Sequence, residues 1–191
     1  MRRINRPRCP NPKILKSNYK HPENKKALVD ASFGKCIYCE SKVVHVYYGD
    51  VEHLKPKTKY PELMFDWNNL GFVCAKCNGS KGDKYEEDTP YINPYEEEPQ
   101  DHLIALGALL KHKLGSERGE LTIIDIDLNR PELLEKRQAK IDSIQKAIDA
   151  CMRTNNKRLK KITISTLLEE SGESKEYSLF IKNLFRLHEL I

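Results

Sequence analysis

Two short stretches decide the fold: Cys36-Ile37-Tyr38-Cys39 and Cys74-Ala75-Lys76-Cys77. Each C-x-x-C pair can hold a metal ion from a tight turn. Two pairs together give the closed site of four thiolates that zinc prefers in structural roles. Disulfides are the alternative, but they would be reduced in a cytosolic chain, and a lone C-x-x-C is more typical of a redox site. The two pairs therefore predict one structural zinc ion bound by all four cysteines.

The segment between the two cysteine pairs contains further residues whose side chains are candidates for catalysis or metal binding. Glu52 and His53 stand just ahead of a proline, and Asn69 comes directly before Leu70. The second pair is followed at once by residues 78–83, which read Asn-Gly-Ser-Lys-Gly-Asp. Taken singly, Glu52 would be a solvated surface charge, His53 a histidine whose hydrogen bonds are satisfied, and the asparagines turn formers. Their occurrence together between two zinc-binding pairs is what points to a functional site.

Together these motifs resemble the HNH endonucleases of the ββα-metal fold, in the variant whose last His is replaced by Asn. The resemblance covers residues 33–84 and implies hydrolysis of phosphodiester bonds with one divalent ion, Mg²⁺ or Mn²⁺. It implies that His53 is the general base, because an imidazole with a pKa of about 6.5 can accept a proton near neutral pH. It implies that Asn69 holds the loop and orients that imidazole. Glu52 and Asn78 would supply oxygen ligands to the catalytic ion.

Lysines beside these motifs are candidate contacts to nucleic acid. Lys81 lies one turn beyond the asparagine ligand in a predicted helix, which would aim its ammonium at a phosphate. Lys55 and Lys57 follow the histidine in the next loop. Asp50 and Asp83 are alternative metal ligands, although strand-end solvation and helix N-terminal charge also account for them.

The order of elements predicts an α+β protein with a zinc-stapled ββα-metal nuclease core and an α-rich C-terminal region. Adjacent residues on a strand face opposite sides, so Glu52 and His53 cannot both face one ion along a regular strand. The strand is therefore expected to end or bend there. The front of the chain is expected to form a helix over 23–32, strands around 43–48, 51–54 and 70–73, and a helix from Ala75.

Four parts are expected along the chain. They are a basic N-terminal arm (1–22), the nuclease core with the zinc site (23–84), an acidic connector and strand (85–128), and a C-terminal helical region (129–191). The later elements are a strand over 120–127, a helix with Asn129 as its N-cap and Leu134 to Cys151 along its stripe, a helix over 157–170, and a last helix capped by Ser174.

Charge is distributed unevenly over these parts. Residues 1–81 carry 16 Lys and Arg against 7 Asp and Glu, residues 82–127 carry 4 against 12, and residues 128–191 carry 13 against 9. The N-terminal arm would be drawn to a polyanion through phosphate neutralisation and counterion release, and a solvated tail is the alternative. The acidic connector would form a negative wall beside a nucleic-acid groove or bind a basic partner.

Stretches outside the zinc motifs carry a second resemblance. MRRINRP at the start, INPYEEEP over 92–99 and RGELTIIDIDLNRPELLEKR over 118–137 resemble the PtuB-like HNH nuclease subunit of Septu-type anti-phage systems, which is also found beside certain retrons. This resemblance implies a bacterial defence effector held in a complex by a PtuA-like ABC-type ATPase. It also implies that part of the C-terminal helical region, with Phe180 or Phe185 as examples, is exposed and docks a partner. The alternative is that the whole stripe packs on the helix over Leu134 to Cys151 as core.

Membrane and secretory classes do not fit the chain. Its longest nearly apolar run, Leu103–Leu110, is far shorter than the roughly 20 residues that span a bilayer, and no apolar stretch follows the basic start. A cytoplasmic protein is therefore expected. The rival interpretation is a non-catalytic zinc module that binds nucleic acid or scaffolds a partner, but it gives His53 and Glu52 no task. DNA is the expected substrate, with RNA as the alternative.

Overall fold

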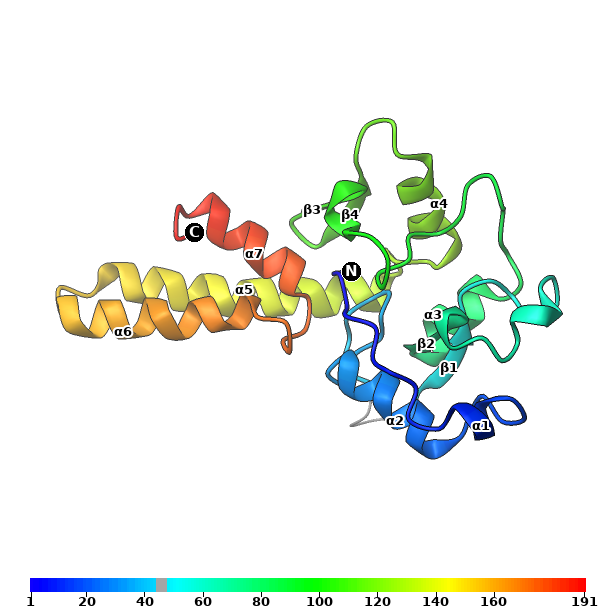
Figure 1. Ribbon diagram of the computed structural model, residues 1–191. Coiled ribbons are helices and arrows are strands. Elements are labelled where there is room, and N and C mark those ends of the chain that lie inside the picture. Colours follow the sequence, from blue (N-terminus) through cyan, green and yellow to red (C-terminus); the bar gives the residue numbers. More distant parts are fainter. Residues whose placement is uncertain (44–47) are drawn as a thin grey trace.

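The computed structural model describes residues 1–43 and 48–191 (Figure 1). The fold combines helices with two separate antiparallel sheets, which is the α+β class that the sequence predicts. The strand expected at 43–48 lies largely outside the described residues. The elements are α1 (Pro12–Leu15), α2 (Pro22–Ala31), β1 (Asp50–His53), β2 (Leu70–Val73), α3 (Ala75–Lys81), β3 (Leu103–Leu106), β4 (Leu109–His112), α4 (Glu117–Asp125), α5 (Pro131–Arg153), α6 (Lys157–Leu168) and α7 (Ser178–Leu187). Single turns of 3-10 helix lie at Pro61–Leu63, Trp67–Asn69, Pro99–Asp101 and Glu169–Ser171.

The ββα element is formed where the motifs predict it. β1 pairs antiparallel with β2, with His53 opposite Leu70, and α3 follows β2 at once. β1 ends at His53. A strand end at this point is the prediction made from Glu52 and His53, which could not both face one ion along a regular strand. The first cysteine turn joins this ribbon because Ile37 N donates to the carbonyl of Phe72 at 3.1 Å. A side chain in place of Gly71 would collide with Ile37, so this glycine permits the close approach.

The N-terminal segment lies on the core, which corrects the alternative of a solvated tail. The Arg6 guanidinium lies 3.7 Å from the centre of the Tyr95 ring. It also donates three hydrogen bonds to carbonyl groups at the start of β2, those of Trp67 (2.8 Å), Asn68 (2.9 Å) and Leu70 (2.6 Å). Arg6 is therefore part of the fold and is not available to a polyanion.

The strand expected over 120–127 is the helix α4. Ser116 caps this helix, because its hydroxyl accepts a hydrogen bond from Gly119 N at 3.1 Å. Thr122 donates its hydroxyl to the carbonyl of Arg118 at 2.7 Å. The β-branched run favours a strand in isolation, but the cap and the burial of one helix face outweigh that propensity.

The second sheet is a β-hairpin that the sequence pattern does not predict. The apolar run over 103–110 folds back on itself as β3 and β4, with Leu106 opposite Leu109. Gly107 in the two-residue turn has φ +57°, a conformation that favours glycine. Asn129 pairs with this hairpin, since its amide both accepts from Leu110 N and donates to Leu110 O. It is therefore not the N-cap of α5, whose cap position is Arg130.

The C-terminal region is a helical hairpin of α5 and α6 that projects from the body, with α7 lying along it (Figure 1). The start of α5 at Pro131 and of α6 at Lys157 follow the predictions. Leu133, rather than Leu134, is the buried leucine of the first turn of α5. Ser174 is not the cap of the last helix, because α7 begins at Ser178 behind Tyr177, whose φ is +55°.

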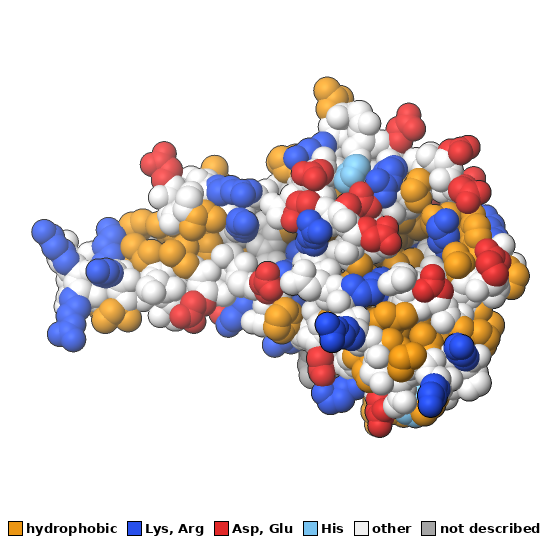
Figure 2. Space-filling model, in the orientation of Figure 1, with side chains coloured by type: hydrophobic (Ala, Val, Ile, Leu, Met, Phe, Trp, Pro, Cys, Tyr) orange, Lys and Arg blue, Asp and Glu red, His pale blue; other side chains and the backbone are white. Residues whose placement is uncertain are grey.

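Phe180 and Phe185 are buried, which corrects their use as examples of a docking surface. Part of the C-terminal region is nevertheless exposed, at Leu159 (51%) and Ile162 (55%) on α6 and at Leu187 (79%) on α7. Lys and Arg side chains gather at the far end of the hairpin (Figure 2). None of the helices in the described residues is long and apolar enough to cross a membrane.

Candidate active site

The four predicted zinc ligands meet at one point. Their Sγ atoms all lie within 4.8 Å of one another, and those of Cys39 and Cys74 are 3.9 Å apart. Zinc with Zn–S bonds of about 2.3 Å in a tetrahedron requires sulfurs about 3.8 Å apart. Cys36, Cys39 and Cys77 are buried and Cys74 is half-buried. The cluster therefore fits a closed zinc site in donor type and in spacing.

The surroundings of the cluster favour thiolates at some of the four cysteines and oppose them at others. Hydrogen bonds with Cys36 and the other cluster thiols lower the pKa of Cys39. Burial raises the pKa of Cys36, so four thiolates can coexist only around a cation. Arg130 Nη1 donates to Cys77 Sγ at 3.6 Å; burial opposes its charge, but the cluster sulfurs, Cys77 first, raise the pKa of Arg130. No motif points to Arg130, which is distant in the chain from both cysteine pairs.

His53 is held in the protonation state that a base needs. Only 6% of the residue is exposed, and Nε2 lies 2.9 Å from the carbonyl oxygen of Met64. Because a carbonyl oxygen can only accept, Nε2 carries the hydrogen in the neutral ring, and Nδ1 keeps its lone pair. Burial, assisted by Lys57, lowers the pKa of His53 below its ordinary value, although the Met64 contact opposes this. The imidazole is therefore neutral at pH 7 and can accept a proton at Nδ1.

Asn69 ties the loop after β1 to the start of β2. Its Oδ1 accepts from Lys55 N at 2.7 Å, and its Nδ2 donates to Lys55 O at 3.0 Å and to Leu63 O at 3.3 Å. Leu63 directly precedes Met64, so the same amide braces the segment that presents a carbonyl to His53. These contacts agree with the role that the resemblance implies.

Lys81 does not reach the surface, which corrects its predicted contact with a phosphate. Its side chain is fully buried, with Nζ 2.6 Å from Glu52 Oε1 and 3.0 Å from the carbonyl oxygen of His53. Burial raises the pKa of Glu52, and the Lys81 ammonium opposes that shift. The ion pair therefore braces α3 against β1 from inside the ββα element.

Asn78 and Asp50 form a second link between α3 and β1. Asn78 Nδ2 donates to Asp50 Oδ2 at 3.1 Å, which turns the amide oxygen of Asn78 toward other partners. Oxygen donors from Glu52, Asn78 and Asp50 are the ligand type that Mg²⁺ or Mn²⁺ takes, so the residues fit such an ion. Asp83, the other alternative ligand, is exposed just beyond α3.

The oxygen donors do not form a preassembled cage. Among the described residues, the four cysteines are the only group of three or more His, Cys, Asp or Glu whose ligand atoms lie close enough to share one ion. A catalytic ion at Glu52 and Asn78 would therefore depend on water and phosphate for most of its coordination.

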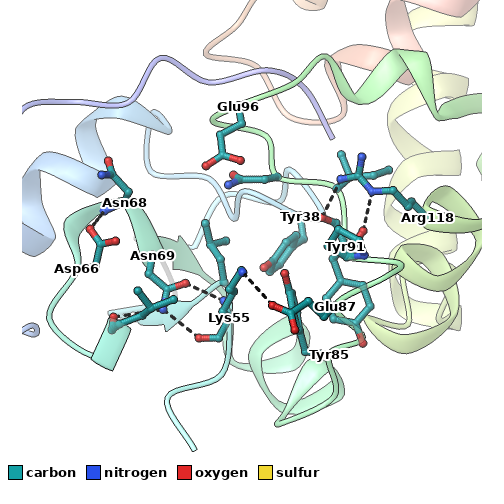
Figure 3. A pocket seen from close by; sticks show the side chains of 15 residues that line it. Tyr38, Lys55, Asp66, Asn68, Asn69, Tyr85, Glu87, Tyr91, Glu96 and Arg118 are labelled. Atoms are coloured by element: carbon teal, nitrogen blue, oxygen red, sulfur yellow. Dashed lines mark hydrogen bonds and ion pairs between the residues drawn. The ribbon is translucent and has the colours of Figure 1, made fainter. Parts of the chain in front are cut away.

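A cavity of about 330 Å³ lies beside the Asn69 loop (Figure 3). The acidic connector supplies its far wall, including Tyr85 and Glu87. The Lys55 ammonium lies 5.7 Å from the Tyr85 ring centre and 4.0 Å from Glu87 Oε1. Lys55, one of the predicted contacts to nucleic acid, is thus engaged by this wall, whereas Lys57 stays exposed near His53.

Comparison with known proteins identifies the domain. Residues 36–84 match the family model described as HNH endonuclease. A protein named Septu protein PtuB from Bacillus thuringiensis is 37% identical over 114 residues, which are 59% of this chain and 44% of that protein. A second Septu protein PtuB, from Bacillus mycoides strain KBAB4, is 28% identical over an alignment of 214 positions that covers 91% of this chain and 68% of that protein.

The match to the first relative thus spans less than half of that protein's length. The family match begins at Cys36 and ends at Lys84, so it encloses both cysteine pairs, His53 and Asn69. The geometry and the comparisons agree with the two resemblances found in the sequence. The chain therefore carries an HNH endonuclease domain, built around a four-cysteine cluster that fits zinc, and it resembles the Septu protein PtuB.

Proposed function

We propose that this protein is a metal-dependent endonuclease that hydrolyses phosphodiester bonds in nucleic acid. The observation that carries the proposal is the state of His53. Its Nε2 is committed to the Met64 carbonyl, which leaves Nδ1 as the acceptor, and burial lowers the pKa of the imidazole, within the segment that matches the HNH family. A hydrolytic base needs these properties, whereas a zinc module that only binds has no use for them.

In this mechanism His53 Nδ1 accepts a proton from the attacking water. Asn69 keeps the loop over 55–63 in place, so that the Met64 carbonyl continues to select the tautomer. Exposed Lys57 provides positive charge close enough to act on the imidazole, which would attract an anionic backbone.

The divalent ion would be held by Glu52 and Asn78, with Asp50 as the alternative ligand. When bound, Mg²⁺ or Mn²⁺ supplies charge stabilisation to the scissile phosphate and to the departing oxygen. Lys81 limits the repulsion among the nearby carboxylates, because its ammonium is paired with Glu52.

The test is cleavage of plasmid DNA and of tRNA by the purified chain in Mg²⁺ or Mn²⁺, compared with His53→Ala. Loss of a general base lowers the rate by about 10²- to 10⁴-fold, while zinc content and melting temperature should stay near those of the wild type. His112→Ala, a histidine substitution on β4, is the matched control and should cleave normally. Cleavage by His53→Ala at the wild-type rate would favour the non-catalytic zinc module.

Asn78→Ala is the cleaner probe of the metal site. Glu52→Ala would leave the Lys81 ammonium buried without its partner, so a loss of activity would be confounded by a loss of stability. Asn78→Ala should raise the concentration of Mg²⁺ or Mn²⁺ needed for half-maximal cleavage. An unchanged metal dependence would remove Asn78 from the ligand set.

The biological setting is also part of the proposal. Similarity to proteins named Septu protein PtuB supports a role in a Septu complex. The resemblance found in the sequence extends the proposal to the nuclease of an anti-phage defence complex with a PtuA-like ATPase, and DNA is the substrate that we propose. The assay should therefore be repeated with the co-encoded ATPase. Co-purification and ATPase-dependent cleavage of DNA are the expected results; cleavage of tRNA alone would make RNA the substrate.

A further inference from the structure

The turn between α1 and α2 lies against the candidate base. Tyr19 in this turn packs edge-on against His53, with ring centroids 4.6 Å apart and planes at 66°. It also lies near Phe65, at a centroid distance of 6.4 Å. The Tyr19 hydroxyl accepts a hydrogen bond from Lys57 Nζ at 3.0 Å. Tyr19 precedes the segment that matches the HNH family, so that segment's motifs do not include it.

Hydrogen bonds hold the turn that carries Tyr19. Asn18 Oδ1 accepts from Lys20 N at 3.0 Å and closes the turn around the tyrosine. Behind it, the fully buried Asn24 side chain accepts from Asn11 N at 2.9 Å and donates to Asn11 O at 3.2 Å. The tyrosine is therefore presented by a braced segment rather than by a free tail.

We propose that Tyr19 is a positioning residue for His53 in the phosphodiester hydrolysis proposed above, on which this inference rests. One hydrogen bond, from Nε2 to the Met64 carbonyl, does not by itself fix the imidazole, because rotation about the Cβ–Cγ bond would break that contact and turn Nδ1 to another direction. The Tyr19 ring against the imidazole blocks this rotation. Nδ1 then keeps one direction toward the water that it deprotonates, and a misplacement of about 1 Å in such a group can cost about 10²-fold in rate.

Lys57 connects this role to the substrate. Its ammonium bonds the Tyr19 hydroxyl and lies 5.2 Å from the centre of that ring. Lys20 lies on the same ring, at 5.6 Å. The two exposed lysines thus place positive charge beside the imidazole, and Tyr19 keeps Lys57 there. A phosphodiester would be drawn to the side of the imidazole where these lysines lie.

The first test compares the steady-state kinetics of the full chain with those of Tyr19→Leu and Tyr19→Phe. Tyr19→Leu removes the ring and should lower kcat by about tenfold or more, with a smaller change in KM. Tyr19→Phe keeps the ring and should stay within about threefold of the wild type. Tyr48→Leu, which removes a tyrosine that is 88% exposed, is the control and should cleave normally.

The second test does not require cleavage. Proton–nitrogen correlation spectra of the histidine rings in the zinc-loaded full chain report the tautomer of His53 and the ring-current shift from Tyr19. In Tyr19→Leu the ring-current shift is lost with the ring itself, so the tautomer is the informative signal: the Nε2–H tautomer should become mixed, while Tyr19→Phe should preserve it. If the wild type fails to cleave, the endonuclease proposal fails, but these spectra still decide whether Tyr19 orients His53.

Two results would overturn the inference. Faster cleavage by Tyr19→Leu than by the wild type would make Tyr19 a cover over the base. Unchanged kcat together with an unchanged His53 tautomer would make the contact incidental. Each variant enters the comparison only if its zinc content and melting temperature show that it is folded. If Tyr19→Leu is not folded at the assay temperature, Tyr19→Met replaces it, with the same expected results.

Discussion

The described residues of 36–84 add a cysteine cluster and buried polar side chains to a small apolar core, whereas α5, α6 and α7 hold together through an apolar stripe alone. The first region places a cysteine cluster, a buried ion pair and a bracing asparagine around two short strands. The second buries one set of aliphatic and aromatic side chains: Ile144, Ile148, Leu167, Ile181 and Phe185. In the first region the identity of single residues decides the structure, and in the second their spacing does. The two regions should therefore fail in different ways.

Removal of zinc should have the largest effect and should separate the two regions. Structural zinc sites contribute about 10–16 kcal/mol of binding free energy that is also folding free energy. With Cys36→Ser, or with a strong chelator, we expect amide hydrogen exchange in β1, β2 and α3 to approach the unfolded rate. The distal turns of α5 and α6 should keep their protection, because their contacts are apolar. Cys9→Ser, outside the cluster, is the control, and simultaneous loss of protection in both regions would contradict the comparison.

A truncation in the helical region should show the opposite pattern. Phe185 is fully buried on α7, so Phe185→Ala should lower the free energy of unfolding by about 3–5 kcal/mol through lost contacts and a cavity. Leu187 on the same helix is 79% exposed, and Leu187→Ala should change it by less than about 0.5 kcal/mol. Urea unfolding measures both, and zinc content should stay unchanged. Equal effects of the two substitutions would show that α7 does not pack as described.

The same contrast accounts for what can be predicted from the sequence. C-x-x-C pairs, an acid-His pair and Asn-Leu at fixed spacing define short connections, so the cysteine cluster and β1, β2 and α3 are predictable. Spacing also places Lys81 one turn beyond Asn78, but spacing alone does not say that its side chain points inward toward β1. The β-branched residues in α4 favour a strand, and that prediction is wrong because it does not include the helix cap at Ser116.

Long-range contacts escape prediction for a different reason. Arg130 meets the cysteine cluster, and Tyr19 meets His53, only because separate segments pack together. Neither residue belongs to a motif, and a lone arginine or tyrosine in a basic stretch is compatible with many surface positions. Periodicity predicts α5 and α6 but not their partners, so it does not predict the burial of Phe180 and Phe185.

A polar junction joins the two regions and gives the next prediction. Glu40, 1% exposed, accepts from Ser178 Oγ at 2.9 Å and lies 3.6 Å from the buried Lys35 ammonium. Glu40→Gln leaves that ammonium without its charge partner, which should cost about 3 kcal/mol of unfolding free energy. Glu173→Gln, at a carboxylate that is 68% exposed, should cost less than about 0.5 kcal/mol. Urea unfolding at pH 7 measures the difference, and equal costs would argue against a junction at Glu40.

The contribution of Glu40 should depend on pH with a definite sign. Burial alone would raise the pKa of Glu40, but the N-terminal ammonium and Lys35 outweigh it, so the pKa lies below its ordinary value of 4.5. The unfolded state therefore binds the proton more tightly, and the stabilisation is complete above about pH 5 and is lost as the pH falls through the folded value. The stability difference between the wild type and Glu40→Gln should shrink below about pH 4. A difference that grows on acidification would show that the carboxyl is protonated in the folded protein.

The smallest expected effect lies on the exposed face of α6. Leu159→Gln with Ile162→Gln should change the free energy of unfolding by less than about 0.5 kcal/mol each, because both side chains are more than half exposed and glutamine is a good helix former. Leu167→Gln on the same helix, where only 8% of the leucine is exposed, should cost several times more. If this face docks the ATPase that the resemblance to PtuB implies, the double variant should lose co-purification with that ATPase at an unchanged melting temperature. Retained association would place the docking surface elsewhere, and a large fall in melting temperature would show that Leu159 and Ile162 belong to the apolar stripe.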